Sequence, residues 1–83
     1  MEILIHPHAQ DRMAERGVLF DEIIETVQSG ESFDAKYNRT GFRKNFNYEA
    51  EWRGKFYHVK QVEVYAEKEF LHWLVITVIS KYY

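Results

Sequence analysis

Residues 6–17 read HPHAQDRMAERG, and this pattern predicts a short amphipathic helix that closes at Gly17. Pro7 suits the first helical turn, because its fixed φ is already helical and the N–H that it lacks would have no partner there. Glycine is favoured in the left-handed backbone that ends many helices. Side chains four positions apart lie on one face of a helix, so this face carries a polar stripe made of His8, Arg12 and Arg16.

The polar stripe points to chemistry on a phosphate. Two guanidinium groups can hold a phosphate, and a histidine ring beside them can transfer a proton. The same arginines stand next to Asp11 and Glu15, however, and a short exposed helix often carries such charges only for solvation. The residues alone leave both interpretations open.

Outward from this helix, the apolar spacing predicts a second helix and then a sheet. Apolar residues recur at helical spacing over residues 20–29, and from Glu31 onward the period changes to two. The alternation predicts four strands, near residues 31–37, 42–53, 56–66 and 71–81, with turns at 38–41, 53–55 and 67–69. Met1 to Ile5 reads as a short apolar lead. We therefore expect an α+β fold in which two N-terminal helices pack on one face of a four-stranded antiparallel sheet.

Length and composition limit the class of protein. A chain of 83 residues is expected to form a single domain, spanning residues 1–83. The absence of cysteine excludes a disulfide framework and thiolate chemistry. We recognise no signal peptide at the start and no apolar run long enough to cross a bilayer. These features predict a cytoplasmic protein with no membrane partner.

The charge is unevenly distributed along the chain. The formal net charge is −2, yet residues 36–60 hold seven basic side chains and only two acidic ones. A basic segment within an acidic protein predicts a local phosphate-binding face, and it would equally complement an acidic partner protein.

Two further residues are candidates for chemistry in the predicted sheet. His58 lies in the basic segment, and histidine is the side chain best suited to transfer a proton under physiological conditions. Thr77 is a hydroxyl that strand alternation places on one face with Val75 and Ile79, where it can also be a tolerated β-branched residue. His6 and His8, even with Asp11 or His72, match no compact zinc spacing. We expect neither a metal nor a cofactor.

Several motifs together resemble a known family. These are HAxxRMxxRGV at residues 8–18, a short helix ending in Gly30-Glu31, Tyr57-His58-Val59 and Val75-Ile76-Thr77-Val78. They resemble small bacterial domains of unknown function that are grouped with RelE-like and BrnT-like toxins in the Barnase–EndoU–Colicin–RelE ribonuclease superfold. The stretch RGVLFDE at residues 16–22 is similar to the BrnT pattern at the same place. The resemblance covers nearly the whole chain and implies a helix–helix–four-stranded-sheet fold with metal-independent RNA cleavage.

We therefore expect a toxin-like, metal-independent endoribonuclease that acts on RNA phosphodiesters and has a cognate antitoxin or another protein as partner. His58 or His8 would transfer protons, and which histidine is acid and which is base stays open. Arg12 and Arg16 would hold the phosphate, and Thr77 would orient one of these groups. The expected substrate contacts are Arg43, Lys44 and Lys60.

Aromatic residues also enter these hypotheses. Tyr48 and Trp52 would stack bases if exposed, although strand alternation favours the core for both. The alternative hypothesis is a non-catalytic interaction module, such as an inhibitor, an accessory subunit or an inactive toxin relative. An uncovered sheet face with Trp73 or Tyr65 would then bind a protein partner. A cleft that joins His58 and Thr77 to the polar stripe would favour the enzyme, and positions on opposite sides of the domain would count against it.

Overall fold

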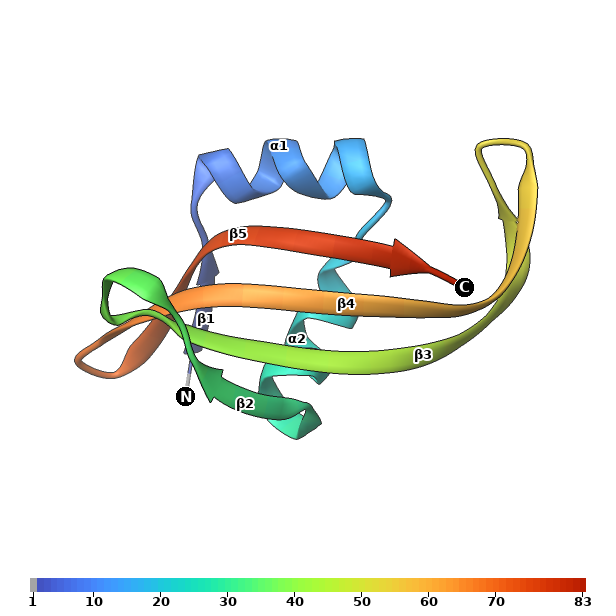
Figure 1. The fold of residues 1–83 in the computed structure, drawn as a ribbon. Helices are drawn as coiled ribbons and strands as arrows, with labels where there is room; N and C mark the ends of the chain where they lie inside the picture. The colour runs from blue at the N-terminus through green and yellow to red at the C-terminus, as the bar shows by residue number, and fades with distance from the viewer. Residues whose placement is uncertain (1) are drawn as a thin grey trace.

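The computed structural model describes residues 2–83 and shows two helices and a five-stranded mixed sheet (Figure 1). Along the chain the elements are β1 (Glu2–Ile5), α1 (Pro7–Arg16), α2 (Phe20–Ser29), β2 (Glu31–Asp34), the 3₁₀ turn η1 (Lys36–Asn38), β3 (Thr40–Trp52), β4 (Lys55–Glu69) and β5 (His72–Tyr82). Across the sheet the strand order is β1-β5-β4-β3-β2, so β1 and β2 form the two edges.

Both helices lie where the sequence predicts them. In α1, Pro7 occupies the first turn, and Gly17 closes the helix with a φ of 68°. In α2, Asp21 and Glu22 lie in the first turn, where negative charge favours the helix N-terminus. The Glu22 side chain also accepts a hydrogen bond from the Leu19 N–H at 2.9 Å. Local signals thus determine both helices.

The expected four-stranded antiparallel sheet is wrong. The segment Glu2–Ile5 is a strand that pairs in parallel with residues 72–75 of β5. The strand has three apolar residues in a row after Glu2 and so shows no alternation, and its partner strand lies at the other end of the chain. No local signal therefore predicts this pairing. The expected first strand is also shorter, because β2 ends at Asp34 and Tyr37 adopts a φ of 62° within η1. Residues 67–69, expected to form a turn, belong to β4.

The core lies between the helices and one face of the sheet. In Figure 1, α1 runs beside β5, and α2 crosses behind β4 and β3. The helices contribute Ala9 of α1 and Ile23 of α2, both fully buried. The buried strand residues on this face of the sheet are Phe42, Val62, Val64, Ala66, Val75 and Val78. We call the opposite side of the sheet, which carries Arg43, Glu63, Tyr65 and Thr77, the open face.

Two irregularities in the sheet decide which side chains reach the open face. Between β4 and β5, Tyr65 pairs with Thr77 and Ala66 pairs with Val75, so β5 carries one extra residue there. This bulge turns Val75 toward the core and Thr77 away from it, which corrects the expectation that both share a face. Between β3 and β4, the register shifts between Asn47 and Ala50.

None of the helices within residues 2–83 combines the length and the apolar character needed to cross a membrane.

Candidate functional site

The arginines of the predicted polar stripe have partners within the protein. The Arg12 Nη1 atom lies 2.6 Å from a carboxylate oxygen of Glu15, one turn further along α1. The Arg16 Nη1 atom donates to the backbone oxygen of Val78 at 2.6 Å. Val78 lies in the part of β5 that β1 does not cover, since β1 pairs only with residues 72–75. Arg16 therefore ties α1 to β5, and Arg12 forms a surface ion pair.

The two candidate histidines lie in different elements. His8 is exposed on α1, and its backbone N–H donates to the His6 Nδ1 atom at 3.0 Å. His58 lies on β4 with 71% of its side chain exposed, and its Nδ1 atom is 3.1 Å from a carboxylate oxygen of Glu49. Within residues 2–83, no three histidine, aspartate or glutamate side chains form a group that could hold a metal ion.

The predicted catalytic residues do not converge. Thr77 lies on the open face, whereas α1 packs on the core side of β5. Within residues 2–83, no hydrogen bond or ion pair joins any two of the five candidates, which are His8, Arg12, Arg16, His58 and Thr77.

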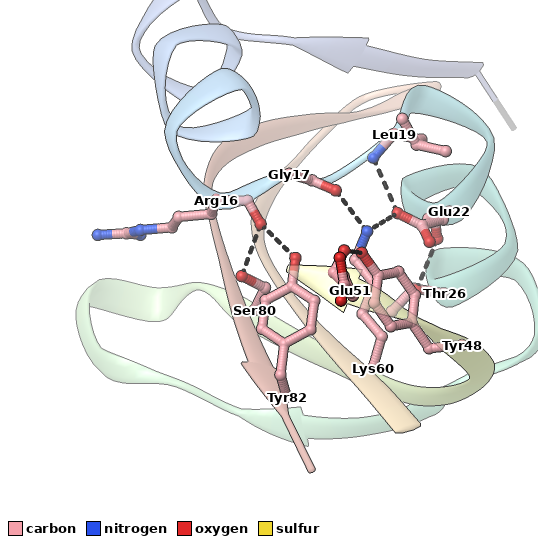
Figure 2. Close-up of polar contacts among 10 residues, drawn as sticks. All are labelled: Arg16, Gly17, Leu19, Glu22, Thr26, Tyr48, Glu51, Lys60, Ser80 and Tyr82. Atoms are coloured by element: carbon pink, nitrogen blue, oxygen red, sulfur yellow. Dashed lines mark hydrogen bonds and ion pairs between the residues drawn. The ribbon is translucent and has the colours of Figure 1, made fainter. Parts of the chain in front are cut away.

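Lys60, a predicted substrate contact, is buried in the junction of α1, α2 and β4, with 2% of its surface exposed. Figure 2 shows its ammonium between the Gly17 backbone oxygen and the Glu22 carboxylate, which lies 2.7 Å away. Beside it, the hydroxyl groups of Ser80 and Tyr82 both donate to the Arg16 backbone oxygen at 2.8 Å. The Lys60 charge is therefore used inside the protein, because buried charges require partners.

Aromatic rings complete this buried junction. The Tyr82 ring is stacked on Trp52 at 5.2 Å and lies edge-on to Tyr48 at 5.4 Å. Tyr48 and Trp52 are half-buried in this cluster of rings, and neither belongs to the main core. Lys44, another predicted substrate contact, pairs with Val62 and so lies on the core side of β3. Among the three predicted substrate contacts, Arg43 alone lies on the open face.

The open face brings together a carboxylate, a guanidinium and a phenol. The Arg43 Nε atom donates to a Glu63 carboxylate oxygen at 2.7 Å, and the Tyr65 hydroxyl donates to the other Glu63 oxygen at 3.3 Å. The Lys81 ammonium lies 3.9 Å from the same carboxylate. Glu63 is only 3% exposed, and neighbouring side chains rather than a helix cover it. We call these four residues the Glu63 cluster.

The cluster shifts the ionisation of two members. The hydrogen bond to Glu63 raises the pKa of Arg43, so this guanidinium keeps its charge. Burial raises the pKa of Tyr65 above its ordinary value of 10.0, and the negative charge of Glu63 raises it further. Tyr65 consequently holds its proton at neutral pH and can pass it on only while receiving another.

A pocket of about 460 Å³ adjoins the Glu63 cluster on the open face. Its walls come from η1, the end of β2, and the strands β4 and β5. The lining residues are Phe33, Asp34, Ala35, Lys36, Tyr37, Arg39, Tyr65, Thr77 and Ile79. The Phe33 ring lies over Gly41, where an added Cβ would come within 2.3 Å of it, and stands edge-on to Tyr65 at 6.0 Å. Glycine at position 41 therefore lets this aromatic wall lie against the sheet.

Sequence reasoning missed Glu63 and Lys81 and named Tyr65 only for a partner-binding surface, although it selected Arg43 and Thr77. Pairing counted from the tight turn at Trp52 and Lys55 would place Arg43 opposite Val64. The register shift between Asn47 and Ala50 moves the pairing by one residue, and Arg43 faces Glu63 instead. The tight turn was the local signal for this strand pairing, and it implied that Arg43 lies opposite Val64. The shift of one residue places Arg43 and Glu63 side by side instead.

Comparison with known proteins gives one match. The profile of a family described as "Domain of unknown function (DUF4258)" matches residues 5–80, which include both helices and the Glu63 cluster except for Lys81. No curated protein and no solved structure matches the chain.

Proposed function

The chain belongs to the DUF4258 family, whose function is unknown, and we propose that it is a metal-independent endoribonuclease of the RelE and BrnT toxin type. The observation that carries this proposal is the Glu63 cluster, in which a proton acceptor, a fixed cation and two proton carriers lie together on the open face. Cleavage of RNA through its own 2′-hydroxyl needs a base, an acid and a cation, and no nucleophile from the protein.

The first step is removal of the 2′-hydroxyl proton. Glu63 is too enclosed to meet the ribose directly, so Tyr65 relays the proton: its hydroxyl receives the 2′ proton while it donates its own proton to Glu63. Since the raised pKa of Tyr65 disfavours a free phenolate, the two transfers occur together. The 2′-oxygen then forms a bond to phosphorus.

The second step is departure of the 5′-oxygen. As the P–O5′ bond breaks, the Lys81 ammonium supplies the proton that the leaving oxygen needs; half of the Lys81 side chain is exposed. Arg43 stabilises the negative charge on the phosphoryl oxygens. Its own counter-charge falls as Glu63 becomes protonated, so its attraction for the phosphate grows when that charge develops.

The cycle closes without an added reactant. Lys81 is 3.9 Å from Glu63, so its flexible side chain first closes to hydrogen-bond distance; protonated Glu63 then returns its proton to Lys81, and Tyr65 is already neutral. The products are a 2′,3′-cyclic phosphate and a 5′-hydroxyl, and no water is consumed. The basic residues of the segment 36–60 that reach the open face, which include Lys36, Arg39 and Arg43, support RNA as the substrate.

The experiment incubates the purified protein with a mixed RNA pool, with and without EDTA, and analyses the ends of the fragments. We expect 2′,3′-cyclic phosphate ends, equal rates with the chelator, and no cleavage of the same sequences as DNA. Intact RNA at high protein concentration, with the protein folded by circular dichroism, would overturn the proposal.

A second candidate is a non-catalytic module that binds a protein partner such as an antitoxin. A groove of about 490 Å³ at the α1–α2 junction favours it, because Leu19 and Phe20 there are 62% and 50% exposed. Two results together would favour this module over the enzyme. The folded protein would leave RNA intact, and it would form a protease-resistant complex with the antitoxin that Leu19→Ser weakens.

A further inference from the structure

We propose that the pocket beside η1 binds the base of one unpaired nucleotide, which deepens the proposed function and rests on it. The pocket of about 460 Å³ opens on the same face as the Glu63 cluster, and Tyr65 belongs to both. A nucleotide held there would place an adjoining phosphodiester near Arg43. The inference thus names the part of the substrate that positions the scissile bond.

The first observation is a donor without an acceptor. The Nε atom of Arg39 is buried, and within residues 2–83 no atom accepts a hydrogen bond from it. The nearest carboxylate oxygen, on Glu67, is 3.7 Å away, which is an ion-pair distance but too long for a hydrogen bond. Buried donors are nearly always satisfied in folded proteins, so this unpaired donor marks the Arg39 side chain, about a third of which is exposed, as a group that can turn to meet a ligand.

The second observation is an aromatic ring held out into solvent. Tyr37 is 82% exposed, and the backbone there is left-handed, with φ values of 62° at Tyr37 and 58° at Asn38. Residues other than glycine rarely adopt this conformation, and such strain gathers at binding sites. The Arg39 guanidinium carbon lies 5.6 Å from the centre of the Tyr37 ring. The Arg39 guanidinium therefore lies near the Tyr37 ring, and both residues line the pocket.

The loop that carries these groups is tied back on itself. The backbone N–H of Ala35 donates to the Arg39 oxygen at 2.9 Å, and the Arg39 N–H donates to the Lys36 oxygen at 3.2 Å. The pocket wall is therefore formed before any ligand arrives, which lowers the entropy lost on binding.

The lining chemistry matches a flat heterocycle with a phosphate. Phe33, Tyr37 and Tyr65 offer ring faces and edges for stacking, which is how proteins hold unpaired RNA bases. Arg39 and Asp34 both line the pocket. Guanine presents hydrogen-bond acceptors that suit the Arg39 donors, and N–H groups that suit the Asp34 carboxylate. Lys36, also in the lining, supplies the charge for the phosphate.

The test titrates the intact protein with guanosine 3′-monophosphate and follows backbone amide shifts by NMR. A mononucleotide has no bond to cleave, so the result does not depend on activity. We expect shifts confined to residues 33–39, 65, 77 and 79, and at least tenfold weaker binding of ribose 5-phosphate. Equal binding of ribose 5-phosphate, or shifts elsewhere, would overturn the inference.

Two variants and their matched controls locate the contacts. Tyr37→Asn removes the ring and introduces a residue that tolerates the left-handed backbone, and it should weaken nucleotide binding at least tenfold. Its control is Tyr83→Asn, at another exposed tyrosine, which should leave nucleotide binding unchanged. Arg39→Lys keeps the charge and removes the Nε donor, with a similar expected loss, whereas Arg12→Lys should change nothing.

The outcomes separate the two proposals. Nucleotide binding at the pocket without RNA cleavage would remove the endoribonuclease and keep the pocket. RNA cleavage that Tyr37→Asn and Arg39→Lys leave unchanged would keep the endoribonuclease and remove the pocket.

Discussion

The Lys60 ammonium and the Glu22 carboxylate, 2.7 Å apart, join the central strand β4 to the first turn of α2 where water has little access. The Lys60 side chain is 3% exposed and that of Glu22 is 16% exposed. Glu22 also accepts the Leu19 N–H, and Lys60 also donates to the Gly17 oxygen. The pair thus satisfies backbone groups in the turn between the two helices.

Lys60→Met should lower the free energy of unfolding by about 3 kcal/mol, because it leaves the Glu22 carboxylate enclosed without its counter-charge. The double variant Lys60→Met/Glu22→Gln should recover much of the loss, since no buried charge then remains. Urea denaturation measures both. A single variant within about 0.5 kcal/mol of wild type would show that the pair contributes little.

Gly17→Ala should destabilise the protein by more than Gly54→Ala, although both glycines have positive φ values, of 68° and 83°. An added Cβ at Gly17 would lie 2.5 Å from the Trp52 ring, whereas nothing lies within 4 Å of one at Gly54. We expect about 1 kcal/mol at Gly54 from backbone strain and about 2–3 kcal/mol at Gly17. Equal losses in thermal denaturation would mean that Trp52 moves aside freely.

Tyr65→Phe should reduce RNA cleavage by about 10²-fold, because it removes the hydroxyl that relays the proton and keeps the ring beside Phe33. Tyr48→Phe is the matched control: it also removes a tyrosine hydrogen bond, at 3.2 Å to the Glu51 oxygen, away from the cluster. Single-turnover rates and melting curves are measured together. Similar rates for the two variants would argue against the relay.

Arg43→Lys should reduce cleavage by about 10²-fold or more, since lysine keeps the charge but loses the guanidinium geometry on Glu63 and the phosphate. Arg12→Lys should leave the rate unchanged, because Arg12 pairs with Glu15 on α1. If instead the Arg12 variant loses activity and the Arg43 variant keeps it, the phosphate site lies on α1.

The unfolding free energy should fall as the pH rises above about 10. Burial raises the pKa of Tyr82, and also of Tyr65, above the unfolded value of 10.0. The unfolded chain therefore loses these protons first, so the stabilisation is complete below pH 10 and is lost as the pH rises through the folded pKa values. Tyr82→Phe should flatten this dependence in urea titrations between pH 8 and 11; an unchanged slope would contradict the assignment.

The sequence predicts the two helices well because their signals are local. Pro7 and Gly17 mark the ends of α1, and the spacing of Ile23 and Val27 marks the buried side of α2. The same reasoning fails for β1, because its pairing with residues 72–75 depends on a partner at the far end of the chain. No alternation within four residues announces a parallel strand.

The candidate site was predictable only in part, because irregular pairing decides which side chains meet. The extra residue in β5 turns Thr77 to the open face, and the shift in β3 places Arg43 opposite Glu63. A change of one residue in register exchanges the two faces of a strand. Lys60 shows the converse case: its burial depends on Glu22 and Gly17, which are distant in sequence.

The outer strands β1 and β2 have only four residues each, beside inner strands of 11 to 15. A long, flat edge would invite another chain to add a strand, the first step of amyloid-like aggregation. Here β2 carries the charged residues Glu31 and Asp34, and the part of β3 that β2 does not cover is interrupted by a register shift. On the other edge, Arg16 donates to the Val78 backbone oxygen, which β1 leaves unpaired. The sheet can therefore leave its open face free for a ligand while its edges resist self-association.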